Sequence, residues 1–385
     1  MQDGITKIKV VGVGGAGGNV VSHMMADERR IRGVEFIAVN TDAQDLDYAV
    51  AHKKIYIGKA LTHGLGAGMN PEIGKQAAEE GRSELGEALD GADIIFITAG
   101  FGGGTGTGAS PVVAEIAKEK GILTIGVVTK PFAFEGVQRM NIAQDGLARL
   151  KEKVDSLVVI PNDKIFSLID KETTAMRAFG YIDDVLRNAV KSVAELINMP
   201  GLINVDFSDI ETTLRDAGTT LIGIGFASGQ DRAVKAATAA IHSPLLEVSV
   251  EGAKGVLFSI AGSKDLKMSE INDIAKTIAE NLDANARIIF GAYHDKSLKE
   301  KSVKVMVIAT GFNGVFSGTR MTVPSLFVSE PPMKKEQTLL DDIEKQKPEN
   351  TEVSEKGKKD EKSIKQAPVG HDTWEIPSFL RKKKK

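Results

Sequence analysis

A heptapeptide of glycine and threonine, Gly-Gly-Gly-Thr-Gly-Thr-Gly at residues 102–108, stands between an apolar run at 94–97 and a helix that we expect to begin near residue 109. Five glycines in seven residues let consecutive backbone N–H groups turn toward one anion, and a helix start adds the positive end of its dipole. The sequence therefore predicts a phosphate-binding loop, with a flexible surface linker as the alternative. No lysine follows the loop, so the Walker pattern of P-loop proteins is excluded. The candidate phosphate ligands are Gly102, Gly103, Gly104, Thr105, Gly106 and Thr107.

A second glycine-rich turn, at residues 12–18, follows the apolar run 8–13, and we expect a helix from about Asn19. Its first, third and sixth residues fit the dinucleotide fingerprint Gly-x-Gly-x-x-Gly. A dinucleotide fold also needs an acid at the end of the second strand, whereas that run ends in Asn40-Thr41-Asp42, so the acid is displaced. Two phosphate loops suit one nucleotide held from two sides better, with a dinucleotide-dependent enzyme as the alternative. The candidates from this turn are Gly14, Gly15, Ala16, Gly17, Gly18 and Asn19.

Composition limits the class of protein. A chain of 385 residues with 42% hydrophobic residues can bury one large core or two moderate ones. It has no cysteine, no signal-peptide pattern and no apolar run near the roughly 18 residues of a membrane span, so we expect a soluble, cytoplasmic protein that does not span a membrane. The net charge is −3, and the basic carboxyl end leaves the rest more acidic, which argues against nucleic acid as a partner.

The order of the predicted elements indicates several domains. Up to about residue 160, strand-like runs alternate with helical stretches, which predicts an α/β fold with a doubly wound, mostly parallel sheet that binds ligands at the carboxyl ends of its strands. One long central helix follows, ending near Asn198, and then a second, smaller α/β unit. We assign a nucleotide-binding domain to 1–176, the central helix and a connecting loop to 177–203, the second α/β domain to 204–316, a linker to 317–370 and a tail peptide to 371–385.

The linker and the tail differ in composition. Residues 331–370 hold nine lysines, nine acids and no aromatic residue, which predicts a disordered segment because so little apolar surface cannot offset the chain entropy. The segment that begins at Trp374 and ends at Arg381 restores apolar side chains, and four lysines follow it. Such a peptide on a long tether is typical of a docking motif, with an inert tail as the alternative.

Several motifs together carry a family resemblance. In chain order they are residues 12–19, 40–42, the loop 102–108, Lys-Pro-Phe at 130–132 with Glu135 and Arg139, Pro-Asn-Asp at 161–163, Asn-Val-Asp-Phe at 204–207 with Asp209, and Ile-Pro-Ser-Phe-Leu-Arg at 376–381. In these motifs the chain resembles the FtsZ family of bacterial tubulin-like cell-division GTPases. The resemblance implies GTP and GDP as ligands with Mg²⁺, a head-to-tail homopolymer at the mid-cell division site, and membrane-tethering or regulatory division proteins as partners of the tail.

The resemblance also implies roles for single residues. The first turn with Asn19 contacts the nucleotide, Asp42 belongs to the motif that follows the second strand, and residues 104–107 hold the β and γ phosphates. Glu135 and Arg139 lie on the ribose and phosphate side, although their spacing equally fits a surface ion pair. Phe179 stacks on the base, although taken alone it reads as the first core residue of the long helix.

Asp183 is the expected guanine reader, because a carboxylate accepts from both N1–H and the 2-amino group, and adenine lacks that pair of donors. Asp184 stands beside it, and either acid could instead only complement the helix dipole. Asn162 is a plausible second base contact. At His23 the sequence departs from members that carry arginine near the nucleotide, so we assign His23 no role.

Asn204, Asp206 and Asp209 are the candidate catalytic residues. They follow the end of the long helix, whereas Asp183 lies near its start, and 17 helical residues span about 25 Å. Asn204, Asp206 and Asp209 therefore cannot reach the nucleotide that Asp183 of their own subunit binds. We expect them to act on the GTP of the next subunit, in a heterologous contact that makes filaments. The alternative is helix capping, since Ser208 and Glu211 match a capping box.

Two other predictions concern metal and activity. The six histidines show no spacing typical of a zinc site, and Mg²⁺ would be held mainly by phosphate oxygens and water. A scaffold that binds nucleotide without hydrolysing it is the remaining alternative to a GTPase.

Overall fold

A computed structural model of the chain describes residues 6–26, 33–170, 172–199, 201–244, 246, 250–283 and 285–312. The predicted linker at 317–370 and the tail at 371–385 lie outside these described residues. No helix among the described residues is both long enough and apolar enough to cross a bilayer.

Six parallel strands form the first part of the sheet, in the order β3-β2-β1-β4-β5-β6. Alternate residues of each strand enter two separate cores: Ile94 and Phe96 of β4 face one, while Ile95 and Ile97 face the other. Strands that are buried on both faces need continuous apolar runs, which explains why these strands could be recognised in the sequence. The strands are β1 (Ile8–Val13), β2 (Val34–Asn40), β3 (Lys53–Tyr56), β4 (Ile94–Gly100), β5 (Leu123–Lys130) and β6 (Ser156–Pro161).

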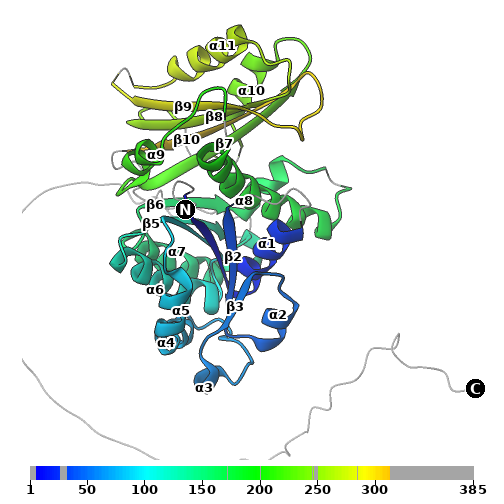
Figure 1. Cartoon of the computed structure of the whole chain (residues 1–385). Helices are drawn as coiled ribbons and strands as arrows, with labels where there is room; N and C mark the ends of the chain where they lie inside the picture. Colours follow the sequence, from blue (N-terminus) through cyan, green and yellow to red (C-terminus); the bar gives the residue numbers. More distant parts are fainter. Residues whose placement is uncertain are drawn as a thin grey trace, which may run out of the picture. The chain divides into compact units, whose positions relative to one another are not determined.

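Helices cover both faces of this parallel sheet, as predicted (Figure 1). One face carries α4 (Pro71–Glu80), α5 (Arg82–Leu89), α6 (Thr105–Glu119) and α7 (Val137–Lys151), and the other carries α1 (Gly14–Ala26) and α8 (Ala175–Asn198). The chain also forms shorter helical segments, which are α2 (Ala43–Tyr48), α3 (Lys59–Thr62), α9 (Phe207–Leu214) and the 3-10 turns η1 (Ala133–Glu135) and η2 (Asn162–Ser167).

The strand order reverses between β1 and β4, because β2 and β3 extend the sheet to one side and β5 and β6 extend it to the other. In open α/β sheets ligands bind at the carboxyl ends of strands beside such a switch point. The glycine turn at 12–18 leaves β1 and the loop at 102–108 leaves β4, so both predicted phosphate loops stand at this switch point.

The helices that follow β1 and β4 begin earlier than the sequence suggested. We expected starts near residues 19 and 109, whereas α1 begins at Gly14 and α6 at Thr105. Glycine has a low helix propensity, which argued for longer loops before both helices. Close packing of the backbone at these glycines overrides that propensity. Most of each glycine segment is thus the first turn of a helix.

The long central helix is α8, and its buried stripe matches the predicted spacing. Ile182, Leu186, Val190 and Val193 lie in a core shared with the parallel strands and with Leu257 and other apolar residues of the second unit. The helix therefore packs against both parts of the sheet.

The second α/β unit extends the same sheet. Strand β7 (Gly218–Ser228) pairs with β6 in parallel through three residue pairs and then with β10 (Ser302–Thr310) in antiparallel fashion. Beyond them come β8 (Gly255–Gly262) and β9 (Arg287–His294), while α10 (Arg232–Ile241) and α11 (Met268–Ala279) cover one face (Figure 1).

Gly108 and Gly180 provide a matched pair of helix positions for testing how tightly α6 packs. An added Cβ at Gly108 would overlap the carbonyl oxygen of Pro71 and lie 2.7 Å from the nitrogen of Lys75, both on α4, whereas the space at Gly180 on α8 is open. We expect Gly108→Ala to lower the free energy of unfolding by about 1–3 kcal/mol through overpacking. We expect Gly180→Ala to raise it by about 0.5–1 kcal/mol. Urea unfolding followed by circular dichroism measures both, and shifts of the same sign would contradict the packing described.

Candidate functional site

The first turns of α1 and α6 lie against each other at the carboxyl edge of the parallel sheet. An added Cβ on Gly14 would lie 3.0 Å from the nitrogen of Gly106, and one on Gly106 would lie 2.6 Å from the carbonyl oxygen of Gly100. No residue other than glycine fits these contacts without a shift of the backbone. Two helix N-termini therefore converge on one place, each with its positive dipole end.

The first turn of α6 leaves backbone donors for a ligand. The N–H groups of Thr105, Gly106 and Thr107 are the first three of the helix and have no partner within it, while the N–H of Gly108 donates to the carbonyl of Gly104 at 2.9 Å. Gly103 at the turn before the helix has open space around it.

The threonine hydroxyls of this loop bind other protein groups. The buried Oγ1 of Thr107 accepts from the N–H of Gly102 at 2.9 Å, and Oγ1 of Thr105 lies 2.6 Å from Oγ1 of Thr41. In this structure the side chains hold the loop in shape and the amides of the first turn are the groups left to meet an anion.

A third glycine segment, which the sequence reasoning missed, completes the edge. Gly64, Gly66 and Gly68 all have positive φ, and the carbonyl of Gly68 accepts from the N–H of Gly104 at 2.7 Å. The alternation of glycines before Asn70-Pro71 was the signal that could have revealed this segment. It is a supporting wall of the phosphate loop.

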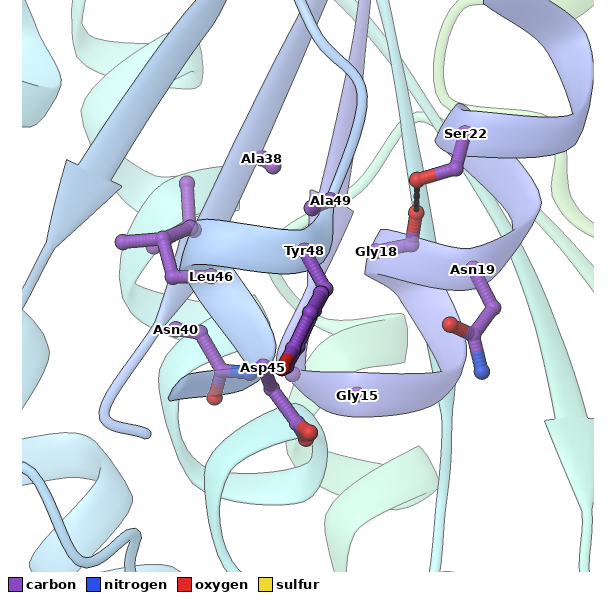
Figure 2. Close-up of a pocket in the computed structure, with 12 residues that line it drawn as sticks. Gly15, Gly18, Asn19, Ser22, Ala38, Asn40, Asp45, Leu46, Tyr48 and Ala49 are labelled. Atoms are coloured by element: carbon purple, nitrogen blue, oxygen red, sulfur yellow. Dashed lines mark hydrogen bonds between the residues drawn. The ribbon is translucent and has the colours of Figure 1, made fainter. Parts of the chain in front are cut away.

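The turn after β1 divides into packing and open positions. Gly17 is buried against the carbonyl oxygen of Thr98, so it has a packing role, whereas Ala16 and Asn19 are exposed. A pocket of about 160 Å³ opens beside α1 and α2, and Figure 2 shows Asn19 and Asp45 among the side chains around it. Its other lining residues are Gly14, Gly15, Gly18, Ser22, Ala38, Val39, Asn40, Leu46, Tyr48 and Ala49.

Asp42 has a clear local function at the start of α2. Its side chain accepts from the N–H of Asp45 at 3.0 Å and caps the helix. The neighbouring Asn40 is buried, and its Oδ1 accepts from the N–H of Thr41 at 2.8 Å. The Asn-Thr-Asp motif thus shapes the wall beside the two phosphate loops.

The remaining candidates gather around the N-terminal part of α8. Phe179 is 53% exposed and meets the ring of Phe132 edge-on at 5.8 Å between centroids, so it is not a core residue of the helix. Asn162 begins η2, and its Oδ1 is buried without a hydrogen-bond partner. Such an oxygen costs about 1–3 kcal/mol unless a ligand satisfies it. Glu135 and Arg139 form an ion pair with each other. Their spacing in the sequence had predicted this pair as the alternative to contacts with the ribose and phosphate.

Asp183 and its neighbour Asp184 have different surroundings. Asp184 pairs with Arg187 at 2.7 Å and is half-exposed, whereas Asp183 turns toward α1, where its Oδ2 lies 2.7 Å from Nδ1 of His23, with 18% of its side chain exposed. Burial raises the pKa of Asp183, and His23 acts in the opposite direction. Of the two acids, Asp183 is the one that contacts α1, the helix whose first turn forms part of the site; its contact with His23 was not expected.

The candidate catalytic residues lie elsewhere. Asp206 is the N-cap residue of α9 but makes no capping bond with its side chain, and Asp209 lies in the first turn. The capping box of Ser208 and Glu211, which was the alternative reading, is not formed, since Ser208 already lies inside the helix. Oδ1 of Asn204 accepts from the N–H of Gly201 at 2.7 Å.

Contacts at the far end of α9 locate these acids on the sheet. The carbonyl of Leu214 accepts from Oγ of Ser156, the first residue of β6, at 2.8 Å, and Arg215 reaches the carbonyl of Gly121, just before β5. Helix α9 therefore lies at the amino ends of the parallel strands, while the glycine segments lie at the carboxyl ends. Along α8, the part from Asp183 to Asn198 alone spans about 22 Å. The structure brings the binding candidates together and keeps the catalytic candidates apart from them.

Comparisons with known proteins agree on the family. The model described as Tubulin/FtsZ family, GTPase domain, matches residues 7–170, and the model described as FtsZ family, C-terminal domain, matches 218–313. An FtsZ dimer from M. jannaschii is 47% identical, with a TM-score of 0.76, over 80% of this chain and 89% of that one. A GTPγS-bound protofilament of CetZ2 from Haloferax volcanii, 22% identical with a TM-score of 0.69 over 80% of this chain and 94% of that one, shares the fold. Because it is 47% identical to the M. jannaschii FtsZ over 80% of its length and matches both family models, the chain belongs to the FtsZ family of tubulin-like, cytoskeletal GTPases.

Proposed function

We propose that this chain forms head-to-tail protofilaments in which the GTP held by one subunit is hydrolysed with the acidic residues of the next. The observation that carries the proposal is the position of the two groups on one sheet: the amides at the starts of α1 and α6 lie at its carboxyl edge and α9 at its amino edge. A triphosphate at one edge cannot reach acids at the other, so catalysis needs a second subunit.

The phosphate end of the proposed site relies on backbone donors. Amides of the first turns of α1 and α6 donate to the β and γ phosphates, in place of a lysine. Hydrogen bonds to charged groups contribute about 1.5–3 kcal/mol each, so several of them can hold a triphosphate. Among the described residues, no group of three or more histidine or acidic side chains is placed to bind a metal, so Mg²⁺ would be held mainly by phosphate oxygens and water.

The base end uses side chains of α8 and η2. Asp183 accepts from N1–H and the 2-amino group of guanine, Asn162 offers its unpaired Oδ1, and the half-exposed ring of Phe179 stacks on the base. Glu135 and Arg139 exchange part of their mutual contact for the ribose and phosphate. Adenine would leave the carboxylate of Asp183 without its donors, which disfavours ATP.

For hydrolysis, Asp206 and Asp209 of one subunit orient the water that attacks the γ-phosphorus of its neighbour's GTP and accept its proton, with Asn204 in support. Neither carboxylate forms an ion pair among the described residues of its own subunit, and the side chain of Asp206 makes no capping bond, so both are available to a neighbour.

Exposed apolar side chains at both ends of the molecule support a head-to-tail contact. Near the base site Met176 is 87% exposed, and Phe134, Phe166 and Phe179 are exposed around the buried Phe132. Beside the acids, Leu202 is 67% exposed. Different patches that meet across a contact which does not close produce filaments.

We further propose that these filaments form the division ring at mid-cell in the cytoplasm. The tail segment from Trp374 to Arg381, which lies outside the described residues, would dock membrane-tethering and regulatory division proteins. The four lysines after it would add attraction to anionic lipid of about 1 kcal/mol each.

Complementation between two variants tests the split site. Asp209→Ala keeps the nucleotide site but loses the acid, so we expect GTP binding without turnover; Asp183→Asn keeps the acid but loses most GTP affinity. An equimolar mixture should regain part of the phosphate release that neither variant shows alone, because one supplies the GTP and the other the acid. Phosphate release with GTP, together with light scattering, measures the effect.

The matched control is Asp273→Ala, which removes an exposed acid from α11 and should leave turnover unchanged. Wild-type activity per subunit should also fall on dilution, because monomers lack the second half of the site. Constant specific activity on dilution, or no recovery in the mixture, would refute split-site catalysis.

The guanine reader can be tested by exchanging the base. Asp183→Asn presents an amide, whose N–H group suits the 2-oxo group of xanthine. We expect GTP affinity to fall about 100-fold, because the two hydrogen bonds from guanine to a charged carboxylate are lost, and we expect XTP affinity to rise. Titration calorimetry with GTP, XTP and ATP measures the shift. The same exchange at Asp184 should not reverse the preference, and a reversal there would assign the role to Asp184.

Deletion of residues 371–385 tests the tail. We expect turnover and filament formation to persist, since the tail lies far along the sequence from both proposed half-sites, while mid-cell localisation and co-sedimentation with the division proteins of the cell are lost. Replacing only the four terminal lysines by serine should weaken binding to anionic vesicles and spare protein partners. Intact localisation of the deletion variant would exclude the docking role.

A further inference from the structure

The contact between His23 and Asp183 joins the last turn of α1 to the early part of α8. The two helices share a core in which Val20 and Met24 pack with Ile182 and Leu186, so the positions of both polar residues are fixed by buried neighbours. Nδ1 of His23 lies 2.7 Å from Oδ2 of Asp183, and its hydrogen bond acts on that carboxyl. The side chain of His23 is 57% exposed, whereas that of Asp183 is 18% exposed.

From this geometry we propose that His23 is a positioning residue for guanine recognition: it donates from Nδ1–H to Oδ2 of Asp183 and so holds both carboxylate oxygens in the plane that the base requires. The inference rests on the proposed role of Asp183. Each carboxylate oxygen has two lone-pair directions, so Oδ2 can accept from His23 and from the base at once. His23 acts through Asp183 and need not touch the nucleotide.

The charges around Asp183 support this arrangement. Desolvation by burial raises its pKa, His23 lowers it by charge and by hydrogen bonding, and the charge of Asp184 raises it again. Asp184 is itself paired with Arg187. Because a protonated carboxyl loses acceptor capacity, a residue that lowers the pKa of Asp183 also preserves its ability to read guanine.

Among the described residues, His23 and Asp184 are the charged neighbours that act on Asp183. The charged groups on the other elements that pack against α1 and α8 are Lys9, Glu35, Asp45, Asp47, Glu115, Lys118, Glu119, Lys130, Asp163, Lys164, Arg287 and His294. None of these is among the groups that shift the pKa of Asp183. In the part of the chain that the structure describes, Asp184 is thus the charged neighbour of the pair.

The test compares GTP with ITP, whose base keeps N1–H but lacks the 2-amino group. We expect wild-type protein to prefer GTP by about tenfold or more, the worth of one hydrogen bond to a charged group. In His23→Ala we expect this preference to shrink at least threefold while ITP affinity changes little, a pattern that general damage to the fold would not produce. Affinities come from titration calorimetry of the full chain at several pH values.

The pH profile gives a second, independent readout. Without His23 the pKa of Asp183 rises, so the loss of GTP affinity on acidification should begin at higher pH in His23→Ala than in wild type. Asp184→Asn removes the charge that raises the pKa of Asp183, so the loss of GTP affinity on acidification should begin at lower pH in this variant than in wild type. His23→Arg supplies a donor and a positive charge at this position and should restore both the base preference and the pH profile.

Three outcomes would overturn the inference: an unchanged GTP-to-ITP ratio in His23→Ala, a higher GTP affinity in that variant, which would make His23 a competitor of the base, or a loss that His23→Arg does not restore. Failure of the proposed function looks different. In that case wild-type protein itself would not prefer GTP over ITP or ATP, before any variant is compared.

Discussion

The close approach of backbone to backbone at the β1–β4 switch point is the constraint on which the rest of the structure depends. Gly14 lies against Gly106, and Gly104 lies against the carbonyl of Gly68, at distances that leave no room for a side chain. This contact brings the starts of two helices to one point and leaves their first amides for a ligand. A lysine is unnecessary where two helix ends supply the positive potential.

The same sheet also accounts for the distance between the proposed nucleotide site and the proposed catalytic residues. Parallel strands have all their carboxyl ends at one edge, so the loops that follow β1 and β4 necessarily meet there. The chain reaches α9 only after α8 has carried it back to the other edge, where Leu214 bonds to the first residue of β6. The separation of the proposed binding and catalytic groups thus results from the topology, and the proposed assembly would bring them together.

Much of this arrangement could be predicted from the sequence because the signals were local. Strands buried on both faces gave continuous apolar runs, and the stripe from Ile182 to Val193 gave the long helix. The starts of α1 and α6 were placed too late because the contacts that stabilise glycine in a helix come from distant segments. The pairing of His23 with Asp183 and the support of Gly68 for Gly104 also join residues far apart in sequence, and no local pattern reports such contacts.

The buried Oδ1 of Asn162 has a consequence for the life of the protein in the cell. Left without any partner, such an oxygen lowers the stability of the fold by about 1–3 kcal/mol, and a bound group that donates to it removes that penalty. Under the proposed function, subunits without nucleotide would therefore be less stable than loaded ones and more open to proteases. The supply of nucleotide would then also set how long each copy survives.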